Sequence, residues 1–123
     1  MPNQSIIHDR LTLILESINL ILERSERIKT AQDFVKDKEG IELMDSIAMR
    51  LQMIGENAKR INKEEENFFE SKLKLDPDPI IRFRDFISHH YEKTDYEIIY
   101  DICSHYILIM KKQIDEYFAS TNN

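Results

Sequence analysis

Apolar residues recur along much of the chain at alternating steps of three and four, which is the spacing of one face of an α-helix. The first run predicts a long helix over residues 4–28, and the second predicts another over residues 41–62. Gly55 lies inside the second helix, and we expect it to let another helix approach closely, because glycine in a helix interior is otherwise unfavourable. The two apolar faces consist of Ile7, Leu11, Ile14, Ile18 and Ile21 in the first helix and Met44, Ile47, Leu51, Ile54, Ala58 and Ile61 in the second.

A third helix is predicted over residues 79–90, after a less regular stretch at residues 63–78. Asp78 can cap this helix, and Pro79 suits its first position, where a missing N–H does no harm. The residues expected to be buried are Ile80, Phe83, Phe86 and Ile87.

A fourth helix is predicted over residues 95–119, because Thr94 and Glu97 have the spacing of a capping box. Thr30 and Asp33 have a similar N-cap spacing, which predicts a brief helical turn before the second long helix. The expected inner face of the fourth helix consists of Ile99, Ile102, Tyr106, Ile109, Gln113 and Tyr117, with Cys103 and Met110 beside it.

The connections between these helices are short, and short connections make neighbouring helices antiparallel. We therefore predict an all-α fold, an antiparallel up-and-down bundle of four or five helices. The length of 123 residues fits one domain over residues 1–119, with residues 120–123 as a frayed tail. The apolar faces are wider than one small bundle needs, which favours a homodimer formed through helices.

Composition excludes several classes of protein. The chain has two glycines, too few for the glycine-rich loops that hold dinucleotides or phosphates, and one cysteine, Cys103, which rules out a disulfide framework. No apolar run is long enough to span a membrane, and no signal peptide is evident, so we expect a cytoplasmic protein that does not bind membranes. The net charge of −6 argues against a broad surface for nucleic acid, although it leaves room for a local site.

Metal and hydrolase motifs are also absent. Di-iron bundles carry Glu three residues before His, but the residues three before His8, His89, His90 and His105 are Ser5, Phe86, Ile87 and Ile102. We therefore expect no metal site and no cofactor.

Ionisable residues concentrate between positions 82 and 91. Asp85 and His89 lie one helical turn apart, so the carboxylate can accept a hydrogen bond from the imidazole and raise its basicity. Arg84 is adjacent to Asp85 and can hold phosphate oxygens, while His89 can move a proton. Because RNA supplies its own 2′-OH nucleophile, this set could cleave RNA without a metal. Such pairs also occur on helices that have no catalytic role, and the residues alone leave both interpretations open.

The local charge balance favours a site shared between two copies. Five basic residues between positions 71 and 93 are offset by four acidic ones, so one copy has a weak positive field. Two copies facing across a dimer axis would bring Arg82, Arg84, His89 and His90 into one cleft, which a phosphate backbone would find more attractive.

The segment from Arg84 to Tyr91 resembles the Arg-x4-His-x-Tyr motif of HepT toxins, which are ribonucleases of the HEPN superfamily. Asp85 occupies the position after the arginine, where that pattern favours a polar residue. The stretch at residues 51–58 is similar to an Ile-Gly-Glu-Ala-type stretch of the same family. The chain departs from the family pattern at His90, where a small residue is common, and in having no tryptophan.

The resemblance implies a dimeric HEPN bundle that acts as a metal-independent endoribonuclease in a toxin–antitoxin system. Arg84 would stabilise the phosphate, His89 would act as general acid or base, and Asp85 would orient them, with Arg82 and His90 in supporting positions. It also implies a partner, an MntA-like nucleotidyltransferase antitoxin that transfers AMP to Tyr91 and silences the toxin. The alternatives are a non-catalytic module that binds nucleotide or a nucleotidyltransferase, and a plain dimeric scaffold.

Overall fold

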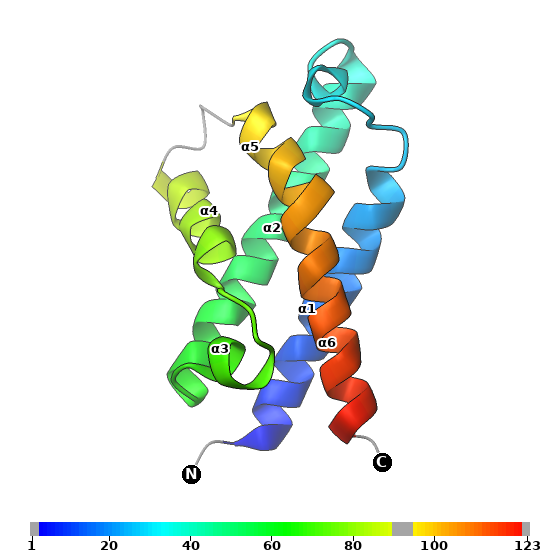
Figure 1. The fold of residues 1–123 in the computed structure, drawn as a ribbon. Helices are drawn as coiled ribbons and strands as arrows, with labels where there is room; N and C mark the ends of the chain where they lie inside the picture. The colour runs from blue at the N-terminus through cyan, green and yellow to red at the C-terminus, as the bar shows by residue number, and fades with distance from the viewer. Residues whose placement is uncertain (1–2, 90–94, 122–123) are drawn as a thin grey trace.

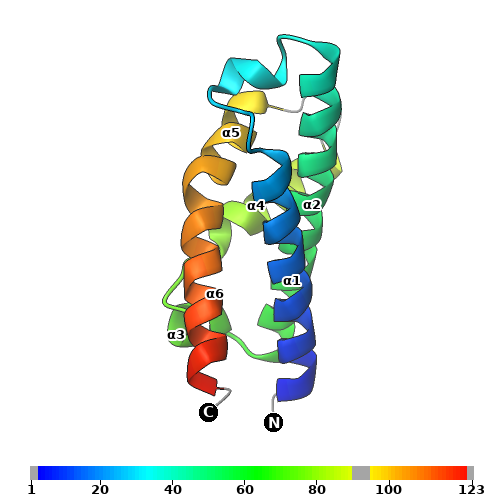
Figure 2. The same ribbon diagram turned by 90° about the vertical axis from the view of Figure 1, so that its right-hand side faces the viewer.

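The structure, a computed structural model, describes residues 3–89 and 95–121, with the backbone alone at positions 88 and 89. Every regular element in these ranges is helical, which confirms the predicted all-α class. Consecutive long helices run in opposite directions, and the two ends of the chain lie at the same end of the bundle (Figures 1 and 2). The elements are α1 (Gln4–Arg24), η1 (Ala31–Phe34), α2 (Lys38–Glu64), α3 (Phe68–Lys72), α4 (Asp78–His89), α5 (Tyr96–Asp101), η3 (Ile102–Tyr106) and α6 (Ile107–Thr121).

The apolar faces predicted for the first two helices form the centre of the core. All five residues predicted on the α1 face and all six on the α2 face are buried. The helix α2 packs against α1 on one side and against α4 on the other (Figure 1). Within the described residues, no helix has the length and apolar character needed to cross a membrane.

The helix boundaries differ from the predicted ones at one backbone turn and at two side-chain caps. The helix α1 ends at Arg24, four residues before the predicted end, and a turn closes between Ser25 and Ile28. The helix α2 begins earlier than predicted because the side chain of Asp37 accepts a hydrogen bond from the backbone of Gly40. Asp95 caps the last helix, so that helix begins at the next residue.

The inner face predicted for the last helix is partly wrong beyond its first turns, although Tyr106 and Tyr117 pack against the core as expected. Residues Ile102–Tyr106 form a π-helix, in which the N–H of Ile107 reaches the carbonyl of Ile102. This wider turn inserts one residue into the helical repeat, so the fully buried positions after it lie one residue later than predicted. Ile109 is 52% exposed as a result. The buried residues from the π-helix onward are Ile102, Cys103, Ile107, Met110 and Ile114.

The less regular stretch after α2 contains a short helix that the sequence pattern does not predict. The helix α3 is enclosed by two residues in the left-handed backbone region, Asn67 with φ 63° and Lys74 with φ 52°. Its first two residues, Phe68 and Phe69, are fully buried. The short helix therefore closes the end of the core beneath α4.

The brief turn predicted near Thr30 is present as the 3₁₀-helix η1. The carboxylate of Asp33 accepts hydrogen bonds from the backbone N–H groups of Lys29 and Thr30, at 2.8 and 3.1 Å. These bonds lower the pKa of Asp33 to about 2. The hydroxyl of Tyr100 donates to the carbonyl of Lys29, which ties α5 to the same corner.

Gly55 sets the separation of α2 and α4, as the sequence predicts. A Cβ atom at this position would lie 2.5 Å from the Cβ of Arg84 and 2.8 Å from the carbonyl oxygen of Ile80. Both neighbours belong to the α4 backbone or its first side-chain atom, so they cannot turn away without moving the helix. The absence of a side chain at Gly55 therefore allows the close contact of the two helices.

We expect Gly55→Ala to destabilise the protein by about 1–3 kcal/mol, the usual cost of overpacking a tight contact. The added methyl must push α4 away from α2, and this cost exceeds the gain in helix propensity. Urea denaturation followed by circular dichroism measures the change. The matched control is Glu42→Ala at an exposed position of α2. An unchanged or higher stability of Gly55→Ala would contradict the close contact.

Candidate functional site

The helix α4 carries the predicted cluster and presents Arg84 to α2. The side chain of Arg84 is 26% exposed, because the Gly55 contact covers its base while its end reaches the surface. The Oε2 atom of Glu56 accepts a hydrogen bond from Nε of Arg84 at 2.8 Å and forms an ion pair with its Nη2 at 2.7 Å. The guanidinium is thus held along one edge by a carboxylate from a different helix.

Asp85 joins the same network from the neighbouring position on α4. Its Oδ1 accepts a hydrogen bond from Nη1 of Arg84 at 3.0 Å and one from Nζ of Lys59 at 3.4 Å. Glu56 and Lys59 lie three residues apart on α2, which places them on one helical face. Two residues of α2 and two of α4 therefore form a continuous chain of ion pairs.

The network changes the acid–base behaviour of its members in opposite directions. The hydrogen bond from Arg84, followed by the one from Lys59, lowers the pKa of Asp85. The bonds to Asp85 and Glu56 raise the pKa of Arg84, so this guanidinium stays charged. Two cations and two carboxylates cancel, and Arg60 adds a positive charge, because its Nε lies 3.9 Å from Oε1 of Glu56.

The structure separates Arg82 from the Arg84 network. The side chain of Arg82 is 83% exposed, and its ion pair is with Asp78 one turn earlier, at 3.9 Å. It lines a groove of about 320 Å³ between α4 and the start of the last helix. The lining residues of this groove are Pro79, Arg82, Phe83, Phe86, Ile98, Asp101 and Ile102.

The remaining predicted site residues lie at the end of α4 and beyond it. His89, of which the backbone is described, is the last residue of α4 and lies one helical turn after Asp85. Its side chain, together with His90 and Tyr91, lies outside the described residues. The predicted hydrogen bond between Asp85 and the His89 imidazole is therefore still a prediction.

Glu56 and Lys59 were not among the candidate residues from the sequence. Lys59 is separated from Asp85 by 26 positions in the sequence, and Glu56 is separated from Arg84 by 28. Periodicity along one helix does not reveal such a pairing between two helices. A signal was present in Gly55, because a glycine that admits α4 implies that its neighbour Glu56 lies at the same contact.

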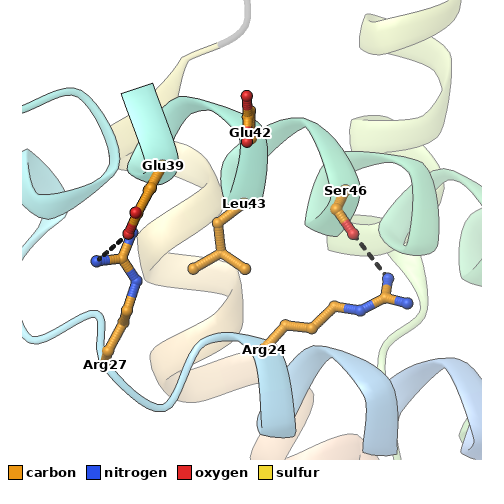
Figure 3. A pocket seen from close by; sticks show the side chains of 6 residues that line it. All are labelled: Arg24, Arg27, Glu39, Glu42, Leu43 and Ser46. Atoms are coloured by element: carbon orange, nitrogen blue, oxygen red, sulfur yellow. Dashed lines mark hydrogen bonds and ion pairs between the residues drawn. The ribbon is translucent and has the colours of Figure 1, made fainter. Parts of the chain in front are cut away.

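Two other features lie away from the network. A shallow hollow of about 400 Å³ at the other end of α2 is lined by two arginines and two glutamates, so it offers no net charge to a ligand. Arg27 faces Glu39, whereas Glu42 points away from both arginines (Figure 3). Arg24 donates to Ser46 there at 2.7 Å, and Arg27 pairs with Glu39 at 3.8 Å. Burial raises the pKa of the Cys103 thiol to about 12, which makes it a poor nucleophile.

No group of three or more histidine, cysteine, aspartate or glutamate side chains in the described part of the chain is placed to hold a metal ion. The network can bind a phosphate group and orient it. Its arginine can present N–H donors to phosphate oxygens, and its carboxylates fix the position of that arginine. A proton-transfer group would have to come from the end of α4.

A family model described as Ribonuclease HepT-like matches residues 14–117. The chain belongs to the HepT-like ribonuclease family. The match spans both α2 and α4, so it includes Glu56 and Lys59 as well as the segment that begins at Arg84. Searches of curated proteins and of solved structures gave no significant match. Membership of the HepT-like family confirms the resemblance drawn from the sequence.

The lowered pKa of Asp85 predicts how the network of this HepT-like protein responds to acid. An unfolded aspartate titrates near pH 4, so the stability that Asp85 contributes is present above that pH. It is lost as the pH falls through the lower pKa of the folded state. We expect Asp85→Asn to melt below the wild type at pH 7, and the two melting temperatures to converge below pH 4.

The control for this comparison is the same substitution in an Arg84→Ala background. Because the Arg84 hydrogen bond is the largest cause of the shift, the effect of Asp85→Asn on the melting temperature should shrink there. An equal effect in both backgrounds would show that the two side chains are not coupled.

Proposed function

We propose that this protein is the toxin ribonuclease of a toxin–antitoxin system and that it cleaves RNA without a metal ion. The observation that carries the proposal is the position of Arg84 in a chain of the HepT-like family. It is anchored at its base between α2 and α4, partly exposed at its end, and five residues before His89 on the same helix. A fixed cation and a histidine on the same helix supply the two groups needed to hold a phosphodiester and move a proton.

In this mechanism each group has a defined task. Arg84 binds the oxygens of the scissile phosphate and stabilises the charge that develops there. His89 takes or gives the proton as the 2′-oxygen attacks phosphorus and the 5′-oxygen leaves. Asp85 keeps Arg84 oriented through its hydrogen bond at 3.0 Å. The bond to the 5′-oxygen breaks as the bond from the 2′-oxygen forms, so no metal-bound water is required.

Silencing by AMP transfer to Tyr91 forms part of the same proposal. Tyr91 follows His89 by two positions. A nucleotidyltransferase of the MntA type would transfer AMP from ATP to its hydroxyl, with pyrophosphate as the leaving group. The added phosphate would place negative charge two residues after His89 and repel RNA, in addition to filling space.

A homodimer completes the proposed site. The groove beside α4 has an apolar floor that includes Phe83, Phe86 and Ile98, and Ile98 is 44% exposed. Arg82 and Asp101 line the same groove, so a second copy related by a two-fold axis would place each arginine against the partner's aspartate. Such self-complementary charge favours a second copy of this chain as the occupant of the groove.

We expect the purified protein, shown by intact mass to carry no AMP, to cleave RNA in the presence of EDTA. His89→Ala should lower the rate by about 100-fold or more, the usual contribution of a general acid or base. His105→Ala, at an exposed position of the last helix, is the matched control and should be fully active. Tyr91→Phe should cleave RNA and resist silencing when a cognate nucleotidyltransferase and ATP are added.

Equal cleavage by the wild type and His89→Ala would overturn the catalytic assignment. Binding of nucleotide or of the nucleotidyltransferase without any turnover of RNA would instead support the non-catalytic module. Circular dichroism of each variant shows whether its fold is intact.

We expect Ile98→Glu to convert a dimer into a monomer, because the new carboxylates would meet in the apolar groove. Light scattering after size-exclusion chromatography measures the mass. Leu13→Glu is the matched control, since it alters an exposed apolar residue on α1 and should leave the dimer intact. A dimer that persists in Ile98→Glu would place the interface elsewhere.

A further inference from the structure

The ion pair between Glu56 and Arg84 ties the guanidinium itself to a second helix. The other pair between the two helices, Lys59–Asp85, holds Asp85 instead. Nε of Arg84 donates a hydrogen bond to Oε2 of Glu56 at 2.8 Å, and Nη2 forms an ion pair with the same oxygen at 2.7 Å. Asp85 is adjacent to Arg84 on α4 and moves with it, whereas Glu56 belongs to α2. Glu56 therefore fixes the guanidinium relative to the body of the bundle.

Such fixation matters because arginine is long and flexible. A catalytic group has to be held within about 0.5 Å of its working position, and the end of Arg84 extends beyond the part of the side chain that packs on Gly55. The hydrogen bond from Nε and the ion pair at Nη2 restrict rotation about the terminal side-chain bonds. They set the direction in which the guanidinium faces an incoming phosphate.

The same carboxylate has an opposite effect on binding. A negative charge 2.7 Å from Arg84 cancels much of the attraction that this cation exerts on an RNA backbone. Removing the charge should strengthen RNA binding and so lower KM. Removing the hydrogen bond should leave the guanidinium poorly oriented and so lower kcat.

We propose that Glu56 is a positioning residue that orients Arg84 for RNA cleavage and, through its charge, weakens RNA binding. The inference rests on the proposed ribonuclease function and assigns a role to a residue of α2 that lies outside the Arg-x4-His-x-Tyr segment. It predicts that the loss of Glu56 lowers kcat and lowers KM together.

Two substitutions separate orientation from charge. Glu56→Ala removes both the hydrogen bond and the charge. Glu56→Gln keeps a side-chain oxygen that can accept from the Nε–H of Arg84 but removes the charge. Glu42→Ala is the matched control, because it removes one negative charge from an exposed position at the other end of α2.

We expect Glu56→Ala to lower kcat by tenfold or more and to lower KM for RNA by a few fold. Glu56→Gln should lower KM to a similar extent while retaining most of kcat. Glu42→Ala should change neither constant by more than twofold. A merely structural role would reduce the melting temperature and the amount of active enzyme, with KM unchanged and no rescue by glutamine. That pattern, or an unchanged kcat in Glu56→Ala, would overturn the proposal.

A second measurement does not depend on cleavage. The Nε–H of Arg84 should give a slowly exchanging resonance in ¹⁵N-labelled protein, assigned by its loss in Arg84→Lys. Exchange should be at least tenfold faster in Glu56→Ala and near the wild-type rate in Glu56→Gln. If the wild type fails to cleave RNA, the ribonuclease function fails while this measurement still tests the orientation of Arg84. Equal exchange in wild type and Glu56→Ala overturns the positioning role in either case.

Discussion

The close contact between α2 and α4 at Gly55 determines where a site can form in this protein. Because Gly55 has no side chain, the backbone of α4 can approach until a Cβ at that position would lie 2.5 Å from the Cβ of Arg84. This approach brings Arg84 over the face of α2 that carries Glu56 and Lys59. The ion pairs at 2.7–3.4 Å between the two helices follow from that separation, and a wider spacing would leave the same residues on unconnected surfaces.

The network that results is built for orientation more than for attraction. Its two carboxylates balance its two principal cations, and the chain as a whole has a net charge of −6. Under the proposed function, the network would contact a few phosphates of RNA at short range, because it offers no broad positive surface. That is the arrangement expected of a site that positions one phosphodiester.

The sequence predicted the fold well where one helical face decides burial. All eleven positions predicted on the α1 and α2 faces are buried, because their periodicity is regular and both helices lie at the centre of the bundle. The prediction was wrong where the helix itself is irregular, since nothing in the residues Ile102–Tyr106 marks a π-turn. It also did not find α3, whose two phenylalanines are too few to show a period.

For the candidate site, the sequence predicted Arg84 and Asp85 as neighbours but not their partners. Spacing along one chain indicates which residues share a helix face, whereas the pairing of Arg84 with Glu56 depends on how two helices pack. Gly55 was the one position at which sequence and packing were connected. Its expected role as a place of close approach is confirmed by the contact with Ile80 and Arg84.

The π-turn at Ile102–Tyr106 has a consequence for the surface beside α4. One inserted residue rotates the two halves of the last helix against each other by about 100°, the angle between successive residues of an α-helix. The α6 half can then turn its apolar side toward α1, while the α5 half is free to face η1 and α2. In a helix of regular pitch, the direction in which one half turns its apolar side would fix the direction for the other half. The irregular turn therefore lets the residues bordering the groove, Ile98 and Asp101, change without disturbing the core that α6 completes.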